Sequence, residues 1–463
     1  MVDKEENVTK VATSFPLQRP RFEVAPLVEN RGQFLAAIEE LSGGQGPLAV
    51  DAERASGYRY FANAYLFQFY RRGSRIFLID PIPFMKSDEV HQVLIDRFNG
   101  ELAQEEWIIH ASTQDLPCIR EFGFKPERIF DTELGARLAG LPRVGLGPLV
   151  EELLSLSLAK EHSAVDWSIR PLHPEWRNYA ALDVDVLPDL RDALSLIIER
   201  QGKSELIAEE FRSILAAPEP TPRKDPWRRT SGIHHVKGRR GLALVRELWI
   251  ERDRIARHRD IAPGRLFPDF AISDIAIAAR HLTPPEFKKE AKDLFHSSQH
   301  FQRHYRKFGK EFIPDWSEAV IRALALPESE LPQMRAASDA LPPVKIWRER
   351  APLAYARLTH ARFNLSERAS MLTMPVENLI SPELVRRVVW MSEKEPQRLQ
   401  IDSQPPAAIA GALTALLRDG GAREWQIGQA LEPIMEALKE REPRVEVGIE
   451  VSAVDESGSP SQD

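Results

Sequence analysis

The hydrophobic pattern of the first 200 residues predicts a run of strands followed by strands that alternate with helices. Strands are expected at 22–27, 47–53, 64–70, 75–80 and 106–110. Helices are expected at 34–41, 90–98, 147–156 and 174–198. The strands at 64–70 and 75–80 form a hairpin around the turn Arg72-Gly73-Ser74. This order is typical of an α/β domain with a mixed sheet.

Two acids stand at the end of the strand at 47–53. Leu48 and Val50 read as buried, and Asp51 and Glu53 follow. Residues i and i+2 of a strand share one face, so the two carboxylates project together. Burying adjacent carboxylates is costly unless a cation compensates their charge. Taken alone, the pattern favours a strand end with two solvated acids, because D-x-E is common.

Further polar residues follow at intervals along the chain. Thr113 can cap a helix after the strand at 106–110, which puts Asp115 in its first turn, where an acid also complements the helix dipole. Tyr179 and Asp183 lie at i and i+4 on one helix face, where they can make an ordinary local contact. A second pair of acids, Asp131 and Glu133, is interpreted as capping or structural.

Four motifs occur in a fixed order: D-x-E at 51–53, H-x-x-x-x-D at 110–115, D-W-x-x-R-P-L at 166–172 and Y-x-x-x-D at 179–183. Over residues 22–215 the chain therefore resembles the ribonuclease D family, in the DEDDy group of 3′–5′ exonucleases. The resemblance implies a ribonuclease-H-like architecture. The chain departs from the family pattern in two places: Ala52 stands between the acids where many members have Thr, and Arg54 follows them where many have an apolar or aromatic residue. This leaves the carboxylates in place and puts substrate contacts near 54–60 in doubt.

The resemblance implies two divalent cations, Mg²⁺ or Mn²⁺, held about 3.5–4 Å apart by carboxylates. Asp51 would bridge both ions, Glu53 and Asp183 would complete the site that activates water, and Asp115 would support the second ion directly or through water. Tyr179 would orient the attacking water, since an ordinary tyrosine titrates near pH 10 and is a poor free base. Contacts to nucleic acid are expected from Arg54, Tyr58, His110, Gln114, Trp167, Arg170, Trp227, Arg228 and Arg229.

The remainder of the chain divides into segments by composition. Amphipathic helices at 242–257 and 354–363 suggest a weak internal duplication, and both copies resemble the helicase-and-RNase-D C-terminal (HRDC) domain, the second more distantly. The expected segments are a flexible tail at 1–20, the exonuclease domain at 22–215, a Pro-rich basic linker at 216–240, the HRDC domain at 241–325, the divergent copy at 340–442 and a disordered acidic tail at 443–463. Within the linker, Trp227 could stack on a base or dock the linker.

The net charge of −7 conceals a basic middle. Residues 221–310 carry 21 Lys and Arg against 10 Asp and Glu, a net of +11, so the remainder carries −18. This indicates either a polyanionic partner or a solvated, charged helical surface.

Cys118 is the single cysteine, which suits a reducing cytoplasm and a buried core position. An acidic N-terminus without an apolar stretch argues against a signal peptide, and no segment approaches the ~20 apolar residues of a membrane span.

The expected activity is hydrolysis of RNA from a single-stranded 3′ end to nucleoside 5′-monophosphates, with transfer RNA precursors as the simplest substrates. Preference for RNA over DNA comes from the resemblance and not from the residues. Two alternatives stay open: a DNA 3′–5′ exonuclease acting in repair, and a non-catalytic scaffold that binds RNA. No membrane association and no obligate protein partner are expected.

Overall fold

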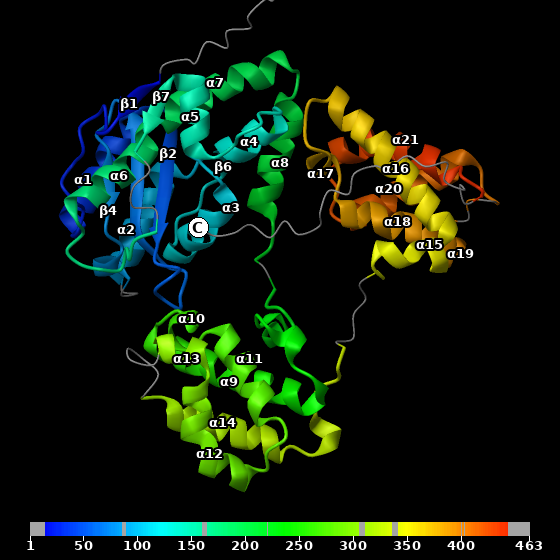
Figure 1. The fold of residues 1–463 in the computed structure, drawn as a ribbon. Coiled ribbons are helices and arrows are strands. Elements are labelled where there is room, and N and C mark those ends of the chain that lie inside the picture. Colours follow the sequence, from blue (N-terminus) through cyan, green and yellow to red (C-terminus); the bar gives the residue numbers. More distant parts are fainter. Residues whose placement is uncertain are drawn as a thin grey trace, which may run out of the picture. The chain divides into compact units, whose positions relative to one another are not determined.

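The computed structural model describes residues 14–85, 89–159, 164–219, 221–304, 311–335, 341–399, 401 and 403–442. The chain forms two compact units, residues 1–338 and 339–463 (Figure 1). Of the two predicted tails, residues 1–13 and 443–463 lie outside the described residues. In the described part of the chain, no helix combines the length and the apolar character that crossing a bilayer requires.

A five-stranded mixed sheet organises the first unit and confirms the predicted α/β class (Figure 1). Its strand order is β4-β3-β2-β5-β6, with β2, β3 and β4 antiparallel and β2, β5 and β6 parallel. The strands are β2 (Gln45–Arg54), β3 (Ala64–Arg72), β4 (Phe77–Ile79), β5 (Glu106–Ile109) and β6 (Arg128–Asp131). The predicted hairpin is therefore β3 and β4, and the strand that carries the D-x-E motif lies at the centre of the sheet.

The predicted strand at 22–27 is replaced by two isolated bridges, Val24 to Ile76 and Val28 to Ile79. The predicted tail, where it is described, is ordered and not free. Strand β1 (Phe15–Leu17) pairs in parallel with β7 (Leu156–Leu158). Arg21 Nε then donates to Asp185 at 2.6 Å, so charge pairing fixes this segment to the domain.

Helices flank the sheet, and the long predicted helix at 174–198 is two helices. They are α1 (Arg31–Ser42), η1 (Ile82–Phe84), α2 (Glu89–Leu102), α3 (Ser112–Phe122), α4 (Thr132–Leu138), α5 (Leu146–Leu154), α6 (Pro174–Asp185), α7 (Leu187–Arg200) and α8 (Ser204–Ala216). The break falls at Val186 because Pro188 has no N–H to continue the ladder and its ring crowds the preceding turn. Helix α6 packs on β2, β3 and β4, while α3 also contacts β2 and β3.

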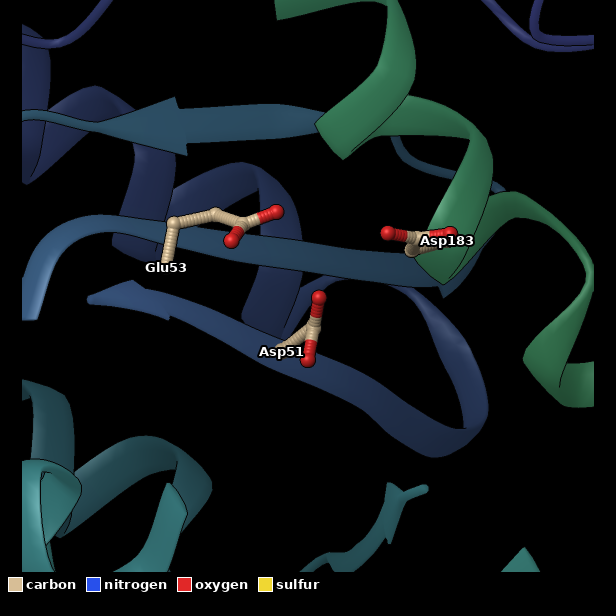
Figure 2. A group of neighbouring side chains, drawn as sticks. All are labelled: Asp51, Glu53 and Asp183. Atoms are coloured by element: carbon tan, nitrogen blue, oxygen red, sulfur yellow. The ribbon is translucent and has the colours of Figure 1, made fainter. Parts of the chain in front are cut away.

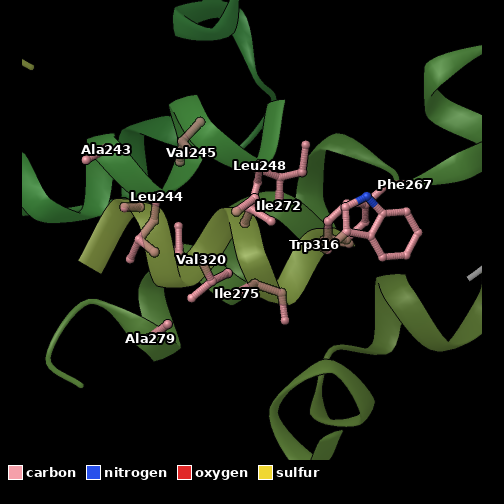
Figure 3. Packing of buried hydrophobic residues seen from close by; sticks show 14 of the residues in the cluster. Ala243, Leu244, Val245, Leu248, Phe267, Ile272, Ile275, Ala279, Trp316 and Val320 are labelled. Atoms are coloured by element: carbon pink, nitrogen blue, oxygen red, sulfur yellow. The ribbon is translucent and has the colours of Figure 1, made fainter. Parts of the chain in front are cut away.

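The second part of the first unit is a helical bundle with a continuous apolar core (Figure 3). Its elements are η2 (Pro226–Arg229), η3 (Ile233–His235), α9 (Gly238–Arg259), α10 (Pro263–Leu266), α11 (Asp269–Ala279), α12 (Pro284–Ser297), α13 (Gln299–His304), α14 (Ile313–Ala325) and η5 (Glu328–Glu330). Figure 3 shows Leu244, Leu248 and Trp316 among the side chains that line this core. The predicted linker is therefore wrong from Pro226 onward, because this stretch folds onto the bundle and buries Trp227 in its core.

The second unit is helical throughout its described residues. Its elements are η6 (Val344–Ile346), α15 (Trp347–Arg350), α16 (Pro352–Met371), α17 (Val376–Leu379), α18 (Pro382–Lys394), α19 (Pro396–Leu399), α20 (Pro406–Asp419) and α21 (Glu424–Leu438). Trp347 packs on Trp390 with ring centroids 4.9 Å apart. The buried Arg357 donates to the carbonyls of Ser392 and Glu440, so a polar bond network ties the ends of this unit together.

Candidate active site

Three carboxylates converge where the end of β2 meets α6 (Figure 2). One oxygen from each of Asp51, Glu53 and Asp183 lies within 4.8 Å of the others. The strand supplies Asp51 and Glu53 from one face because they are two residues apart. The packing of α6 on β2 brings Asp183 from 130 positions further along the chain. Carboxylate oxygens gathered this closely are the ligands that hard divalent cations prefer.

The fourth predicted acid lies at the edge of this group. Asp115 is in the first turn of α3, 6% exposed, and its carboxylate lies 3.5 Å from the Arg54 guanidinium. The cap of that helix is not Thr113, because α3 begins earlier, after Ala111, which has a left-handed φ of 57°. The structure thus brings Asp115 near Asp51, whose negative charge raises the pKa of Asp115. The positive charge of Arg54 lowers that pKa.

Asp131 replaces the predicted cap and has a structural role, as interpreted from the sequence. Its carboxylate accepts the backbone N–H of Ser112 at 2.8 Å and the Ser112 hydroxyl at 2.7 Å. It also accepts the N–H groups of Glu133 and Leu134, both at 3.0 Å, and so caps α4. One acid therefore fixes the starts of two helices.

Burial raises the pKa of all four predicted metal-site acids above ordinary carboxyl values. For Glu53 the nearby charges of Asp51, Asp183 and Asp115 add to the effect of burial, and for Asp115 and Asp183 the charge of Asp51 does so. The raised pKa of Asp51 comes from burial, opposed by Arg54. This is an acidic cluster whose charge the protein leaves largely uncompensated, and the donor set fits divalent cations.

Tyr179 lies one turn before Asp183 on α6, and the two side chains are hydrogen bonded. Burial raises the pKa of the Tyr179 phenol, and the charges of Asp183, Glu53 and Asp51 raise it further. The group therefore keeps its proton at neutral pH. It can hold a water or a substrate oxygen by hydrogen bonding, and it cannot act as a free base.

Three residues predicted to contact nucleic acid have structural partners instead. Trp167 is 0% exposed and packs on Trp176 with centroids 5.7 Å apart, so its ring offers no surface to a base. Arg170 binds Asp80 at 2.6 Å and the Tyr65 carbonyl at 2.7 Å. Trp227 is 4% exposed, so docking, and not base stacking, accounts for it.

The other predicted contacts occupy varied places. Gln114 is exposed on α3, and Arg229 is exposed at the end of η2. His110 lies 2.9 Å from the Thr132 hydroxyl, and burial lowers its pKa. Arg228 lies over the Trp227 ring, 4.3 Å from its centroid.

Tyr58 lines a cavity of about 520 Å³ that sequence reasoning missed. The β2–β3 loop contributes Tyr58 and Arg59, α6 contributes Trp176, and the helical bundle contributes Asp260 and Arg265. The Arg265 guanidinium lies 3.8 Å from the centroid of the Tyr58 ring. Its lining combines apolar side chains and two aromatic rings with two guanidinium and two carboxylate groups, and Trp176 precedes Tyr179 by about one turn of α6. No sequence pattern marked it, because its walls come from segments about 200 residues apart.

Three family models match separate stretches of the chain. Residues 27–199 match a 3′–5′ exonuclease model, 241–282 match the HRDC domain, and 340–438 match a 3′ to 5′ exonuclease C-terminal domain. Ribonuclease D of Acidiphilium cryptum is 32% identical over 51% of this chain and 58% of its own length. Ribonuclease D of Escherichia coli is 28% identical over 65% of this chain and 75% of its own length. The chain is therefore similar to proteins named ribonuclease D, and its residues 27–199 match the 3′–5′ exonuclease model.

Coverage of these ribonuclease D sequences is partial: the chain spans little more than half the length of several curated relatives. A crystal structure of a protein from Bifidobacterium adolescentis is 35% identical, with a TM-score of 0.76, and covers 92% of this chain and 100% of its own. Escherichia coli RNase D shares the fold with a TM-score of 0.57 at 22% identity, over 85% of this chain and 98% of its own. The HRDC likeness of residues 340–442 stays a prediction.

Proposed function

We propose that this chain is a metal-dependent 3′–5′ exoribonuclease that removes nucleoside 5′-monophosphates from RNA with a single-stranded 3′ end. The observation that carries the proposal is the convergence of Asp51, Glu53 and Asp183 within 4.8 Å, with Tyr179 hydrogen bonded to Asp183. The curated relatives named ribonuclease D support RNA as the substrate. Precursors of transfer RNA are the proposed cellular substrates, and the cytoplasm is the proposed location.

Each residue has a role that its position supports. The charge of Asp51 acts on both Glu53 and Asp115, so Asp51 is proposed to hold both cations. Glu53 and Asp183 would complete one cation site, and Asp115 would support the other. Bound Mg²⁺ or Mn²⁺ would supply Lewis-acid stabilisation of phosphate charge and a more acidic water. Tyr179, which keeps its proton, would orient the attacking water.

The cavity beside α6 is proposed to receive a nucleotide of the RNA strand next to the active site. Trp176 and Tyr58 offer apolar and aromatic surface for a base, and Arg59 and Arg265 offer charge to the backbone phosphates. The proposed path keeps Tyr58 among the predicted RNA contacts. Arg54, already 3.5 Å from Asp115, would lie at the scissile end of this path.

The alternative activities are separated by one experiment. The purified protein is incubated with matched RNA and DNA oligonucleotides, each labelled at the 5′ end or the 3′ end, with Mn²⁺, Mg²⁺ or EDTA. A ladder of shortening 5′-labelled RNA, with nucleoside 5′-monophosphate as the product, is expected with metal and not with EDTA. Faster loss of DNA would favour the repair exonuclease, and RNA binding without cleavage under all conditions would favour the scaffold.

A further inference from the structure

Gln68 is a fully buried amide whose polar atoms have no hydrogen-bond partner in the described part of the chain. It is 0% exposed on β3, and both Oε1 and Nε2 lack a partner. Leaving a buried donor or acceptor unsatisfied costs roughly 1–3 kcal/mol, so such groups are rare in native proteins. Its neighbours along the strand, Phe67 and Phe69, point to the other face and pack in an aromatic cluster with Phe124.

The register of the sheet places Gln68 directly across from Asp51. The two are paired Cα partners in the antiparallel β2–β3 ladder. Residues opposite each other in such a ladder project from the same face, with Cβ atoms about 4.5–5.5 Å apart. On its other side Gln68 pairs with Leu78, which is buried and offers no polar atom. Asp51 is therefore the polar cross-strand neighbour of the amide.

The same face is covered by α6, which carries Asp183 and contacts β2, β3 and β4. Water has no free access to Gln68 at 0% exposure, so solvent does not explain why a polar residue stands here. An apolar side chain of equal length would fill this position and remove two unsatisfied groups. The amide instead lies where its Nε2 can donate to the carboxylate of its cross-strand partner Asp51.

We infer that Gln68 is a positioning residue for the metal site, which donates from Nε2 to the Asp51 carboxylate when that carboxylate holds cations. It would fix the orientation of the shared ligand in the way that outer partners fix metal ligands elsewhere. The inference rests on the proposed function, because it needs the acids to bind metal. It adds a residue that none of the four sequence motifs contains.

The test compares Gln68→Met with Leu66→Met in the full-length protein. Leu66 lies two residues away on the same strand and face, is equally buried and pairs with Glu53, so it is a matched control. Mn²⁺ binding is measured by titration calorimetry, and thermal unfolding is followed in EDTA and in Mn²⁺. Gln68→Met is expected to weaken Mn²⁺ binding about tenfold or more. Its melting temperature in EDTA should equal or exceed that of the wild type, because two unsatisfied groups are gone.

Gln68→Asn is included because it keeps the amide but shortens the chain, and it should also lose Mn²⁺ affinity. Leu66→Met should keep the wild-type affinity. The inference is overturned if Gln68→Met binds Mn²⁺ as the wild type does, or if it unfolds at a clearly lower temperature in EDTA, which would reveal a structural role for the amide. Failure of the proposed function would look different, since the wild type itself would then neither bind Mn²⁺ nor cleave RNA.

Discussion

At the scale of residues, the site is defined by acids that are costly to bury and are buried nonetheless. Burial raises the pKa of Asp51, Glu53 and Asp183, and the charge of Asp51 raises the pKa of the other two further. Arg54 compensates only part of this negative charge. A cluster of this kind is unstable as a set of free carboxylates and favourable as a cation site. Substitutions here should therefore affect metal binding and catalysis far more than folding.

Asp51→Asn should abolish cleavage while leaving the fold intact. The amide keeps the volume of the side chain but removes the charge that both cations are proposed to share. If the lost stabilisation of the transition state is ~4 kcal/mol, the rate falls about a thousandfold. Asp96→Asn, an exposed acid on α2, is the matched control and should be neutral. Near-wild-type rates in Asp51→Asn protein would rule out the proposed two-metal site.

Tyr179→Phe should lower turnover more than RNA affinity. The substitution keeps the ring and removes only the hydroxyl bonded to Asp183. A hydrogen bond to a charged group contributes about 1.5–3 kcal/mol, so the rate should fall roughly ten- to hundredfold, less than at Asp51. Single-turnover rates and equilibrium RNA binding are compared. Parallel losses in both would indicate that the hydroxyl serves only structure or substrate binding.

The raised carboxyl pKa values predict how stability without metal depends on pH. A group whose pKa is higher in the folded than in the unfolded chain stabilises the fold below its unfolded value, about 4, and this contribution is lost as the pH rises through the folded pKa. Asp183 is such a group. In EDTA, Asp183→Asn should therefore melt at a higher temperature than the wild type at pH 8, and the gap should shrink toward pH 4. A gap that widens on acidification would contradict the raised pKa.

At the scale of elements, the β2–β3 loop joins the active-site strand to the helical bundle. Asp260, at the end of α9, accepts the backbone N–H groups of Tyr60 and Phe61 at 3.0 and 3.2 Å. The Tyr58 carbonyl accepts the N–H of Ala262 at 3.0 Å. The loop begins only a few residues after Glu53. The position of the bundle therefore affects the shape of the cavity near Trp176 and the proposed RNA path through it.

Arg265→Ala should weaken the use of longer RNA without changing the chemistry. The substitution removes a cation from the cavity and the guanidinium that lies on Tyr58. KM for an oligonucleotide of several residues should rise severalfold, while kcat changes little. Arg280→Ala is the control, because Arg280 lies on the bundle and donates to the Ile277 carbonyl. Equal effects of the two substitutions would mean that the cavity does not bind RNA.

At the scale of the whole molecule, the basic middle is less available than its charge suggests. Arg252 binds Asp269 at 2.6 Å, Arg240 donates to the Leu326 carbonyl at 2.6 Å, and Arg239 donates to the Leu331 carbonyl at 2.7 Å. Such arginines stabilise the bundle itself. These guanidinium groups keep their charge, but the N–H donors used inside the bundle are not free to contact phosphates.

Removing residues from 225 onward should leave a nuclease that still trims short single strands, because the four acids and Tyr179 precede the cut. Binding of an RNA the size of a transfer RNA should weaken, and its log-log salt slope should become shallower by about 0.7 per lost phosphate contact. The internal pairing of the arginines limits this change to a few contacts. Binding is measured across a salt series, with circular dichroism to verify folding. Equal affinity and slope in both proteins would make the basic middle a solvated surface only.

Local sequence patterns were enough to predict the class of the fold and the acids of the site. Alternation of apolar residues gave the sheet, and the i, i+2 spacing of Asp51 and Glu53 and the i, i+4 spacing of Tyr179 and Asp183 each fix a shared face. Predictions from local patterns were wrong where the environment of a residue is set by a partner distant in the chain. The cap of α3 is Asp131, from another strand, and Trp227 looked like part of a linker until the bundle buried it.

Which faces of these elements meet depends on packing between segments that are distant in the chain. The packing of α6 on β2 joins Asp183 to Asp51, and the approach of the bundle to the β2–β3 loop creates the cavity. Gln68 is the clearest example of a residue that is conspicuous in the sequence but whose role depends on the tertiary structure. A polar residue between the buried aromatic residues Phe67 and Phe69 was a signal in the sequence, but its meaning depended on the register that sets it opposite Asp51. Register is a property of two strands together, so no single segment could have revealed it.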